Sequence, residues 1–244
     1  MTLSPAVLHR LGGEGPPVLF VHGFGADRFG WAANAHALIG TRTVWAVDLP
    51  GHGGAGNAVG DGSAAALATA LAGVAGELGG GLAVIGHSLG GAVALHLARL
   101  MPERITALVL IAPAAVGPPG VSGFQDRFPA IGSAADAAEV LGCLAERPAV
   151  VAPMIAHVLS SLDVPGRRAA LRTVAQALGH AALEQAPPVA PVTVIWGEAD
   201  RVLPCPQGAV LGVHPHVIPA TGHLPHIERS GAVNRLIRGA LAID

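Results

Sequence analysis

The chain has 244 residues, of which 51% are hydrophobic and only 12% charged, and its net charge is −2 at pH 7. This length fits one large α/β domain or two small ones. The apolar content alone would allow a membrane protein, but the most apolar stretch, residues 105–123, contains three prolines and could not stay helical across a bilayer. The first residues lack a basic start followed by an apolar run, so we expect no signal peptide, no membrane association and a cytoplasmic location.

All 14 basic residues are Arg, and the chain contains neither Lys nor Tyr. The absence of Lys excludes Schiff-base chemistry, a P-loop with its phosphate-binding Lys, and lipoyl or biotin attachment to this chain. The charge balance and the lack of long basic runs argue against nucleic acid as a partner. Two cysteines, Cys143 and Cys205, are too few for a thiolate zinc site or a disulfide framework. We therefore expect no cofactor and no metal.

Short apolar runs alternate with helical patterns along most of the chain. A first strand is expected over residues 6–11, and a helix is expected from Ser63, which can cap it, to Gly79, with apolar residues on one face. Strands separated by such helices predict crossover connections and a mostly parallel central sheet flanked by helices. Further strands are expected at residues 18–21, 43–47, 82–85, 106–111 and 192–196, with a weaker one at 213–219.

The alternation breaks between residues 113 and 190, a stretch far longer than one crossover helix. Ser133 with Asp136 predicts one helix start, Pro148 fits the first turn of a second helix, and Asp163 is expected to start a third. We interpret residues 113–190 as a helical cap inserted into a core formed by residues 1–112 and 191–244. The Pro- and Gly-rich segment 113–123 would be its hinge.

The strongest local signal is Gly-His-Ser-Leu-Gly at residues 86–90, between an apolar strand and a helix expected over residues 92–101. A serine on such a sharp strand-to-helix turn needs small neighbours two residues away, and Gly86 and Gly90 supply them. The turn would expose the Ser88 hydroxyl at the sheet edge, and the helix N-terminus would favour negative charge there. The plain structural alternative for Ser88 is a helix N-cap.

A serine nucleophile needs a base and an orienting acid, in the chain order Ser, acid, His for this architecture. Asp200 follows the strand at 192–196, and His223 follows the weaker strand, so both lie in loops at the edge where Ser88 emerges. We expect Asp200 to orient His223, with Glu198 in the same loop as the competing acid, and a turn histidine as the ordinary reading of His223. The backbone N–H groups of Phe24 and Leu89 are expected to form the oxyanion hole.

The other histidines have ordinary structural interpretations. His22 and His52 belong to turn motifs, and we expect them to be hydrogen-bonded. His223 with His226, and His214 with His216, have metal-like spacing, but no carboxylate or thiolate cluster accompanies them, so no metal site is predicted.

Five motifs together resemble the α/β-hydrolase superfamily, and they occur in the order that is typical of it. The resemblance runs from about residue 18 to the end of the chain. They are the segments at residues 21–24, 48–53, 86–91, 196–200 and 221–223. More narrowly, the segments at 111–117, 169–175 and 233–236 are similar to the hydrolase-like domain of acetoin dehydrogenase acetyltransferase components. Members of that family carry a lipoyl domain ahead of this fold. These 244 residues contain no such domain, so we expect a free-standing hydrolase. The single strand that fits before His22 suggests a sheet without the superfamily's first edge strand.

The resemblance implies the α/β-hydrolase fold and a serine hydrolase that acts on a carboxylic ester or related acyl compound through an acyl-enzyme. Ser88 would be the nucleophile, with a small-molecule acyl substrate as partner. Phe124, Phe128 and Met154 are candidate pocket walls, with packing between cap and core as the alternative for each. The low aromatic content of 3% predicts an apolar pocket without stacking sites. Three alternatives stay open: hydrolysis of a C–C bond in diketones or ring-cleavage products, acyl transfer, and a non-enzymatic binding subunit.

Overall fold

The computed structural model describes residues 3–114, 116–118, 120–179 and 190–243. Its centre is a seven-stranded sheet in the order β1-β3-β2-β4-β5-β6-β7. Strand β1 runs antiparallel to β3, and all other neighbours are parallel, as expected from the crossover pattern. The strands are β1 (Val7–Gly12), β2 (Pro17–Val21), β3 (Thr43–Asp48), β4 (Leu82–His87), β5 (Ile105–Ile111), β6 (Val192–Gly197) and β7 (His216–Ile218). One strand precedes β2, as the sequence predicted.

Helices cover both faces of the sheet and define two hydrophobic clusters. On one face, α2 (Ala64–Ala75) and α3 (Leu89–Leu100) bury side chains such as Leu71 and Val93 against Val84. On the other face, η1 (Arg28–Trp31), α1 (Ala32–His36) and α10 (Ser230–Ala240) pack Trp31 and Ile237 against strand residues. The central strands β4 and β2 are buried on both faces, which explains why they read as continuous apolar runs in the sequence.

The predicted caps of α2 are partly right. The Ser63 side chain accepts a hydrogen bond from the Ala66 N–H and starts the helix, but the helix ends at Ala75 and not at Gly79, because Gly76 already follows as its C-cap. The helix after the serine turn begins at Leu89, three residues earlier than expected. For both segments the sequence predicted a helix correctly but placed one of its ends wrongly.

Residues 124–179, here called the helical insertion, lie between β5 and β6. Ser133 caps α5 and Pro148 opens α6, as predicted. Asp163 does not start a helix: it is the C-cap of α7, and α8 begins at Arg167 after the left-handed Gly166 (φ 82°). The insertion contains α4 (Phe124–Arg127), η2 (Phe128–Ala130), α5 (Ala134–Leu141), α6 (Pro148–Val151), η3 (Ala152–Met154), α7 (Ile155–Leu162) and α8 (Arg167–Gly179). Residues 180–189 of the expected cap lie outside the described residues.

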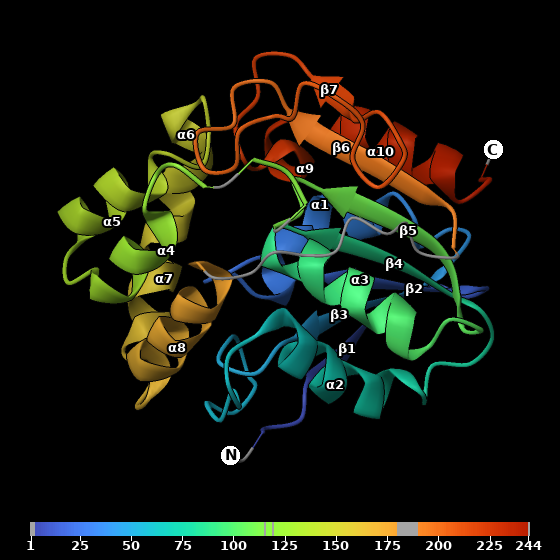
Figure 1. Cartoon of the computed structure of the whole chain (residues 1–244), viewed down its shortest axis with the longest axis horizontal. Coiled ribbons are helices and arrows are strands. Elements are labelled where there is room, and N and C mark those ends of the chain that lie inside the picture. Colours follow the sequence, from blue (N-terminus) through green and yellow to red (C-terminus); the bar gives the residue numbers. More distant parts are fainter. Residues whose placement is uncertain (1–2, 115, 119, 180–189, 244) are drawn as a thin grey trace.

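Figure 1 shows the helical insertion gathered beyond the carboxyl ends of the parallel strands, apart from the helices that flank the sheet. Helix α9 (Pro225–Glu228) lies after β7, close to the same edge. No single described helix is long and apolar enough to cross a membrane; Pro148–Leu162 and Arg167–Gly179 reach that length and hydropathy only as a pair, with a bend of 108° between them.

Candidate active site

Ser88 lies on the turn between β4 and α3 in a strained backbone conformation, with φ 51° and ψ −117°. Its N–H donates to the Ile111 carbonyl (2.9 Å), which ties the turn to the neighbouring strand. A β-carbon at Gly86 would lie 2.4 Å from the Gly90 carbonyl oxygen, and one at Gly90 would lie 2.2 Å from that of Val21. The two glycines therefore allow the close backbone packing that this turn needs.

Asp200 and His223 come from the loops after β6 and β7 and form a buried pair. The Nδ1–H of His223 donates to Oδ2 of Asp200 at 2.7 Å, and the two residues are 2% and 7% exposed. Because a carboxylate only accepts, the proton sits on Nδ1 and leaves Nε2 free as a base. The other carboxylate oxygen, Oδ1, accepts from the N–H groups of Val202 (2.8 Å) and Leu203 (2.9 Å), which fixes the acid in place.

The competing acid, Glu198, is directed elsewhere. Its side chain accepts from the Ala220 N–H at 3.1 Å. The two loops also contact each other through the backbone, since Ala199 N–H donates to the Thr221 carbonyl (2.9 Å). The geometry therefore selects Asp200, the residue expected from the sequence, as the partner of His223.

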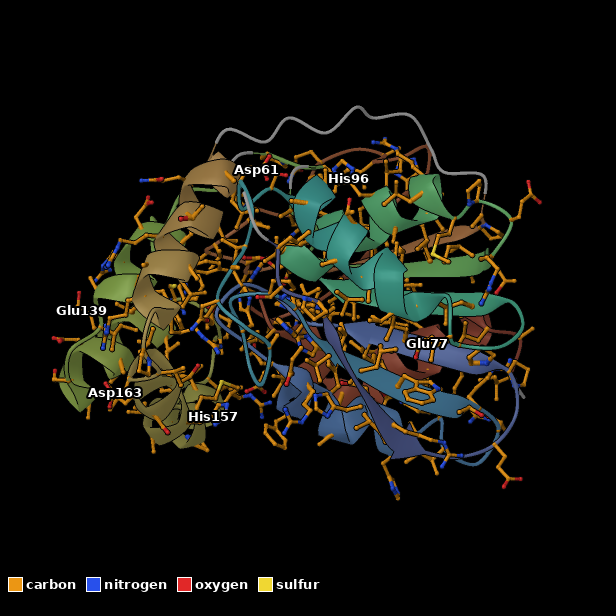
Figure 2. All side chains as sticks on the ribbon, turned by 90° about the horizontal axis from the view of Figure 1, so that it is seen from below. Asp61, Glu77, His96, Glu139, His157 and Asp163 are labelled. Carbon is orange, nitrogen blue, oxygen red and sulfur yellow. The ribbon has the colours of Figure 1, made fainter. Side chains whose placement is uncertain are left out.

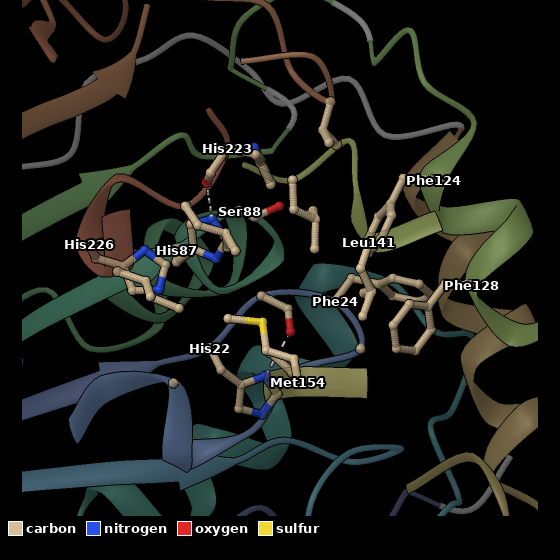
Figure 3. A pocket seen from close by; sticks show the side chains of 18 of the residues that line it. His22, Phe24, His87, Ser88, Phe124, Phe128, Leu141, Met154, His223 and His226 are labelled. Carbon is tan, nitrogen blue, oxygen red and sulfur yellow. Dashed lines mark hydrogen bonds between the residues drawn. The ribbon is translucent and has the colours of Figure 1, made fainter. Parts of the chain in front are cut away.

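A cavity of about 830 Å³ opens at this edge of the sheet, and both Ser88 and His223 line it (Figure 3). The expected pocket residues Phe124, Phe128 and Met154 all line it as well, from the helical insertion. The cavity thus brings the candidate nucleophile and base from the sheet edge together with side chains that are distant in sequence.

The loop after β2 lies directly against the serine turn. A β-carbon at Gly23 would lie 2.7 Å from Nδ1 of His87 and 3.3 Å from the Ser88 β-carbon. Among the described residues, the N–H groups of Phe24 and Leu89 have no hydrogen-bond acceptor. Leu89 is the first residue of α3, whose N-terminus carries partial positive charge. These two N–H groups are the expected oxyanion donors, and both remain available.

The expectation of a pocket without stacking sites is wrong. Four of the five Phe residues of the chain line the cavity. The ring centroids of Phe24 lie 6.3 Å from those of Phe124 and 5.7 Å from those of Phe128, in edge-to-face arrangements. The overall scarcity of aromatic residues does not predict where they gather, because the fold concentrates them beside one site.

His22 and His52 are buried and hydrogen-bonded, as predicted. Nε2 of His22 accepts from the Leu49 N–H (3.1 Å), and its Nδ1–H donates to the Gly23 carbonyl (2.8 Å). His52 donates to the Pro50 carbonyl (3.0 Å), and its Nε2 has no partner in the described structure. Burial lowers the pKa of His22 and lowers that of His52 to about 3. Both therefore stay neutral at pH 7.

His87, beside the nucleophile, has a contact that the sequence did not reveal. Its Nε2–H donates to the backbone carbonyl of His223 at 2.8 Å (dashed in Figure 3). Its ring lies 4.8 Å from that of His223 and 4.5 Å from that of His226. Burial holds the pKa of His87 well below its usual value, so this donor is neutral. His87 therefore connects the serine turn with the candidate base.

Glu228 is a second residue that the sequence analysis missed. It is 5% exposed, and its two carboxylate oxygens accept from Gly222 N–H (2.7 Å) and Glu146 N–H (3.1 Å). Gly222 precedes His223, whereas Glu146 belongs to the helical insertion. A carboxylate five residues after the candidate base is a sequence signal, but only the fold shows that it joins the His223 loop to the insertion.

The histidine spacings that resemble metal motifs do not assemble a site in the described part of the chain. No group of three His, Cys, Asp or Glu residues among the described residues is arranged to hold a metal ion. The spacing of His223 and His226 reflects other contacts, since His223 pairs with Asp200 and the His226 ring packs against Trp31, with ring centroids 4.6 Å apart and a tilt of 34°.

The chain has clear relatives. It is 33% identical over 241 residues to the dihydrolipoyllysine-residue acetyltransferase component of the acetoin cleaving system of Pseudomonas putida, covering 93% of this chain and 64% of that protein. It is 30% identical over 256 residues to the pimeloyl-[acyl-carrier protein] methyl ester esterase of Methylococcus capsulatus, covering 94% and 96% of the two chains. The chain thus spans 64% of the length of the first relative.

The structure is similar to that of a meta-cleavage product hydrolase from Pseudomonas fluorescens IP01. The TM-score is 0.85 at 20% identity, over 98% of this chain and 94% of that one, a likeness of fold. Residues 18–236 match the profile described as the alpha/beta hydrolase family. Since this match spans most of the chain, the protein belongs to the alpha/beta hydrolase family and is an enzyme of that family.

Proposed function

We propose that the protein hydrolyses carboxylic esters of small acyl compounds, with Ser88 as nucleophile, His223 as base and Asp200 as the orienting acid. The observation that carries this proposal is the buried 2.7 Å bond between His223 and Asp200, on a cavity that Ser88 also lines. A sequence identity of 30% to the methyl ester esterase of Methylococcus capsulatus, over nearly the whole of both chains, supports the same choice of reaction.

The reaction follows from the positions of the donors. Ser88 Oγ attacks the ester carbonyl carbon while its proton moves to Nε2 of His223. The carbonyl oxygen becomes an oxyanion, which accepts hydrogen bonds from the N–H groups of Phe24 and Leu89. The C–O bond to the alcohol then breaks, and His223 returns the proton to the leaving oxygen. Water, deprotonated by His223, attacks the acyl-enzyme and releases the carboxylic acid and Ser88.

We further propose that the helical insertion acts as a cap over this site and that Phe124, Phe128 and Met154 bind the acyl part. Their side chains line the cavity, and the insertion lies beyond the carboxyl ends of the strands, where ligands bind in open α/β sheets. Residues 113–190 would then form the cap region and the rest of the chain the core.

A second candidate is acyl transfer, because an acetyltransferase component is 33% identical over 93% of this chain. In that reaction an alcohol or thiol would replace water at the acyl-enzyme. The same site chemistry serves both reactions, so the acceptor that reaches the acyl-enzyme distinguishes them.

Initial rates on p-nitrophenyl esters from acetate to decanoate test the proposal, with Ser88→Ala as the paired variant. We expect turnover by the native protein, a loss of at least about 10³-fold in the variant, and a rate optimum that reports the length of the acyl site. Product analysis with and without an added thiol separates hydrolysis from transfer. Equal rates in the two proteins, or cleavage of diketones without cleavage of any ester, would overturn the proposal.

A further inference from the structure

We propose that the cavity accepts substrates with an uncharged acyl part and rejects those whose acyl part carries a carboxylate. This inference names the substrate class of the same site and therefore rests on the proposed function. The feature that carries it is the distribution of charged side chains around the cavity.

No permanent cation reaches the cavity from the described part of the chain. The chain has no Lys, all 14 Arg residues are described, and none of them lines the cavity. An anionic substrate group bound there would have no guanidinium or ammonium partner. Burying a carboxylate without such a partner is strongly unfavourable, because the loss of hydration is not compensated.

The Arg residues near the cavity are held by other groups. Arg28 pairs with Asp48 (2.5 Å), and Arg127 pairs with Glu139. Others donate to main-chain carbonyls, as Arg168 does to Ile131 (2.7 Å) and Arg201 to Ala145 (2.7 Å). These contacts fasten the insertion and the loops, and none of the four Arg residues lines the cavity.

The histidines of the cavity do not replace the missing cation, and the ring of one of them, His223, is already paired with Asp200. Burial lowers the pKa of His22, His87 and His226, that of His226 to about 3, so these rings are neutral at pH 7. His157, on α7 where the insertion meets the core (Figure 2), donates through Nε2 to Oδ2 of Asp27 at 2.5 Å. Any charge on the His157 ring is therefore matched by that carboxylate.

Asp27 is the one carboxylate among the described residues that line the cavity, and its side chain is only 8% exposed. Its Oδ1 also accepts from the Phe29 N–H at 2.9 Å, so the residue is held in place. Because a carboxylate only accepts hydrogen bonds, Asp27 offers an anionic acyl group no favourable partner. By contrast, two carboxylates of the helical insertion, Glu139 and Asp163, lie on its outer side in Figure 2.

The remaining lining favours apolar groups. It is formed by aromatic and aliphatic side chains, including Phe24, Phe124, Phe128, Leu141, Leu144 and Val158. Such walls stabilise a hydrocarbon chain through the burial of apolar surface. The inference also weighs against carboxylate-bearing ring-cleavage products as substrates of a C–C hydrolase reaction at this site.

Three p-nitrophenyl esters of equal acyl length test the inference: the hexanoate, the adipate with a free carboxylate, and the adipate whose second carboxyl is a methyl ester. We expect kcat/KM for the free carboxylate to be at least about 100-fold below that of both neutral esters. Similar values for all three, or a preference for the free carboxylate, would overturn the inference.

A binding measurement separates this inference from the proposed reaction. Calorimetry with Ser88→Ala, which is expected to leave both esters uncleaved, compares dimethyl adipate with monomethyl adipate, and we expect the neutral compound to bind at least about 30-fold more tightly. If that preference holds but no ester is cleaved, the proposed reaction fails while the inference stands. Equal affinities would overturn the inference whether or not esters are cleaved.

A variant that supplies the missing cation provides the reverse test. Gln125 lines the cavity from α4 and makes no contact that the proposed reaction needs. Gln125→Arg should raise the ratio of kcat/KM for the free carboxylate to kcat/KM for the hexanoate at least tenfold. Gln125→Met, of similar length and without charge, is the matched control and should leave the preference of the native protein intact.

Discussion

The loops at the strand ends and the helical insertion are held in different ways. At the strand ends the backbone itself is packed tightly: a β-carbon at Gly197 would lie 2.0 Å from the Gly222 carbonyl oxygen. In the insertion, packing around the glycines is looser: a β-carbon at Gly179 would have nothing within 4 Å, and one at Gly142 would lie 3.0 Å from the Ala138 carbonyl oxygen. Long side chains also fasten the insertion, such as Arg147, which donates to the Glu228 carbonyl (2.5 Å). The backbone of the insertion approaches a strand-end loop closely at one place, since a β-carbon at Gly222 would lie 2.8 Å from the Leu144 carbonyl oxygen.

The two regions have different proposed roles: the loops at the strand ends carry out the reaction, and the helical insertion selects the substrate. The groups proposed to do chemistry are fixed by the backbone of the sheet edge, where small displacements are not tolerated. Many of the walls that would choose the substrate come from the helical insertion, which is held largely by side-chain contacts and whose wall residues can change with less effect on the chemistry. Variants in the first region should therefore abolish activity or stability, and variants in the second should shift preference.

The largest effect is expected at Asp200. Asp200→Asn would present an amide to the Nδ1–H of His223 and favour the wrong tautomer, so kcat/KM should fall about 10³- to 10⁴-fold. Glu198→Gln, in the same loop, is the matched control and should change kcat/KM less than threefold, because Glu198 contacts Ala220 and not His223. A comparable loss in both variants would show that the loop and not the acid determines the rate.

Gly90→Ala tests the backbone packing at the serine turn. Its β-carbon would lie 2.2 Å from the Val21 carbonyl oxygen, and the overlap should lower the free energy of unfolding by about 3 kcal/mol. Gly73→Ala in α2 is the control: it has open space around the β-carbon and should raise stability by about 0.5–1 kcal/mol. Urea unfolding measures both, and equal effects would remove the claimed tightness of the turn.

The buried histidines of the core predict acid sensitivity. The pKa values of His52 and His226 are about 3 in the folded protein, against 6.5 for the free side chain. Below pH 6.5 the unfolded chain therefore binds more protons, and stability present at neutral pH is lost as the pH falls. Between pH 7.5 and 5, each should cost about 2 kcal/mol of unfolding free energy.

Urea unfolding at the two pH values checks this in the native protein and in the double variant His52→Gln, His226→Gln. The double variant should lose the part of the pH dependence that these two histidines contribute, about 4 kcal/mol between the two pH values, while His22 and His87, whose pKa values burial also lowers, keep their own part. The exposed His214, changed to Gln, should leave the dependence as it is. An unchanged dependence in the double variant would mean that other groups cause it.

Glu228 lies at the junction between the two regions, and its effect should be smaller. Glu228→Gln removes one of two acceptors for the N–H groups of Gly222 and Glu146, so His223 should be placed less accurately. We expect kcat to fall about tenfold while KM stays within twofold, since a positioning residue acts on the reacting groups and not on substrate binding. Glu146→Gln is the control and should match the native protein, because Glu146 contacts Glu228 through its backbone N–H and not through its side chain. A rise in KM with constant kcat in Glu228→Gln would assign Glu228 to the pocket instead.

Much of this arrangement could be predicted from the sequence, since its signals are local. The Gly86–Gly90 spacing, the Ser63 and Ser133 caps and the apolar strands each depend on neighbouring residues, and the structure contains all of them. The chain order of Ser88, Asp200 and His223 predicted which loops meet, because parallel strands bring their carboxyl ends to one edge.

The features that were missed depend on contacts between distant segments. Asp is a common residue at the start of a helix, but the preceding helix extends to Leu162, and Asp163 is its C-cap. The contacts of His87 and Glu228 join residues of the core to loops that only the complete fold brings near. The gathering of Phe rings likewise combines Phe24 of the core with Phe124 and Phe128 of the insertion, about 100 positions later.

Covalent labelling tests directly whether Ser88 is a nucleophile that His223 activates. The native protein is treated at pH 7.5 with a serine-reactive fluorophosphonate, and the modified residue is located by peptide mass spectrometry. We expect one adduct, on Ser88, and labelling at least about 100-fold slower in His223→Ala, because the base activates the hydroxyl. An adduct on another residue, or equal labelling rates with and without His223, would contradict the proposed site.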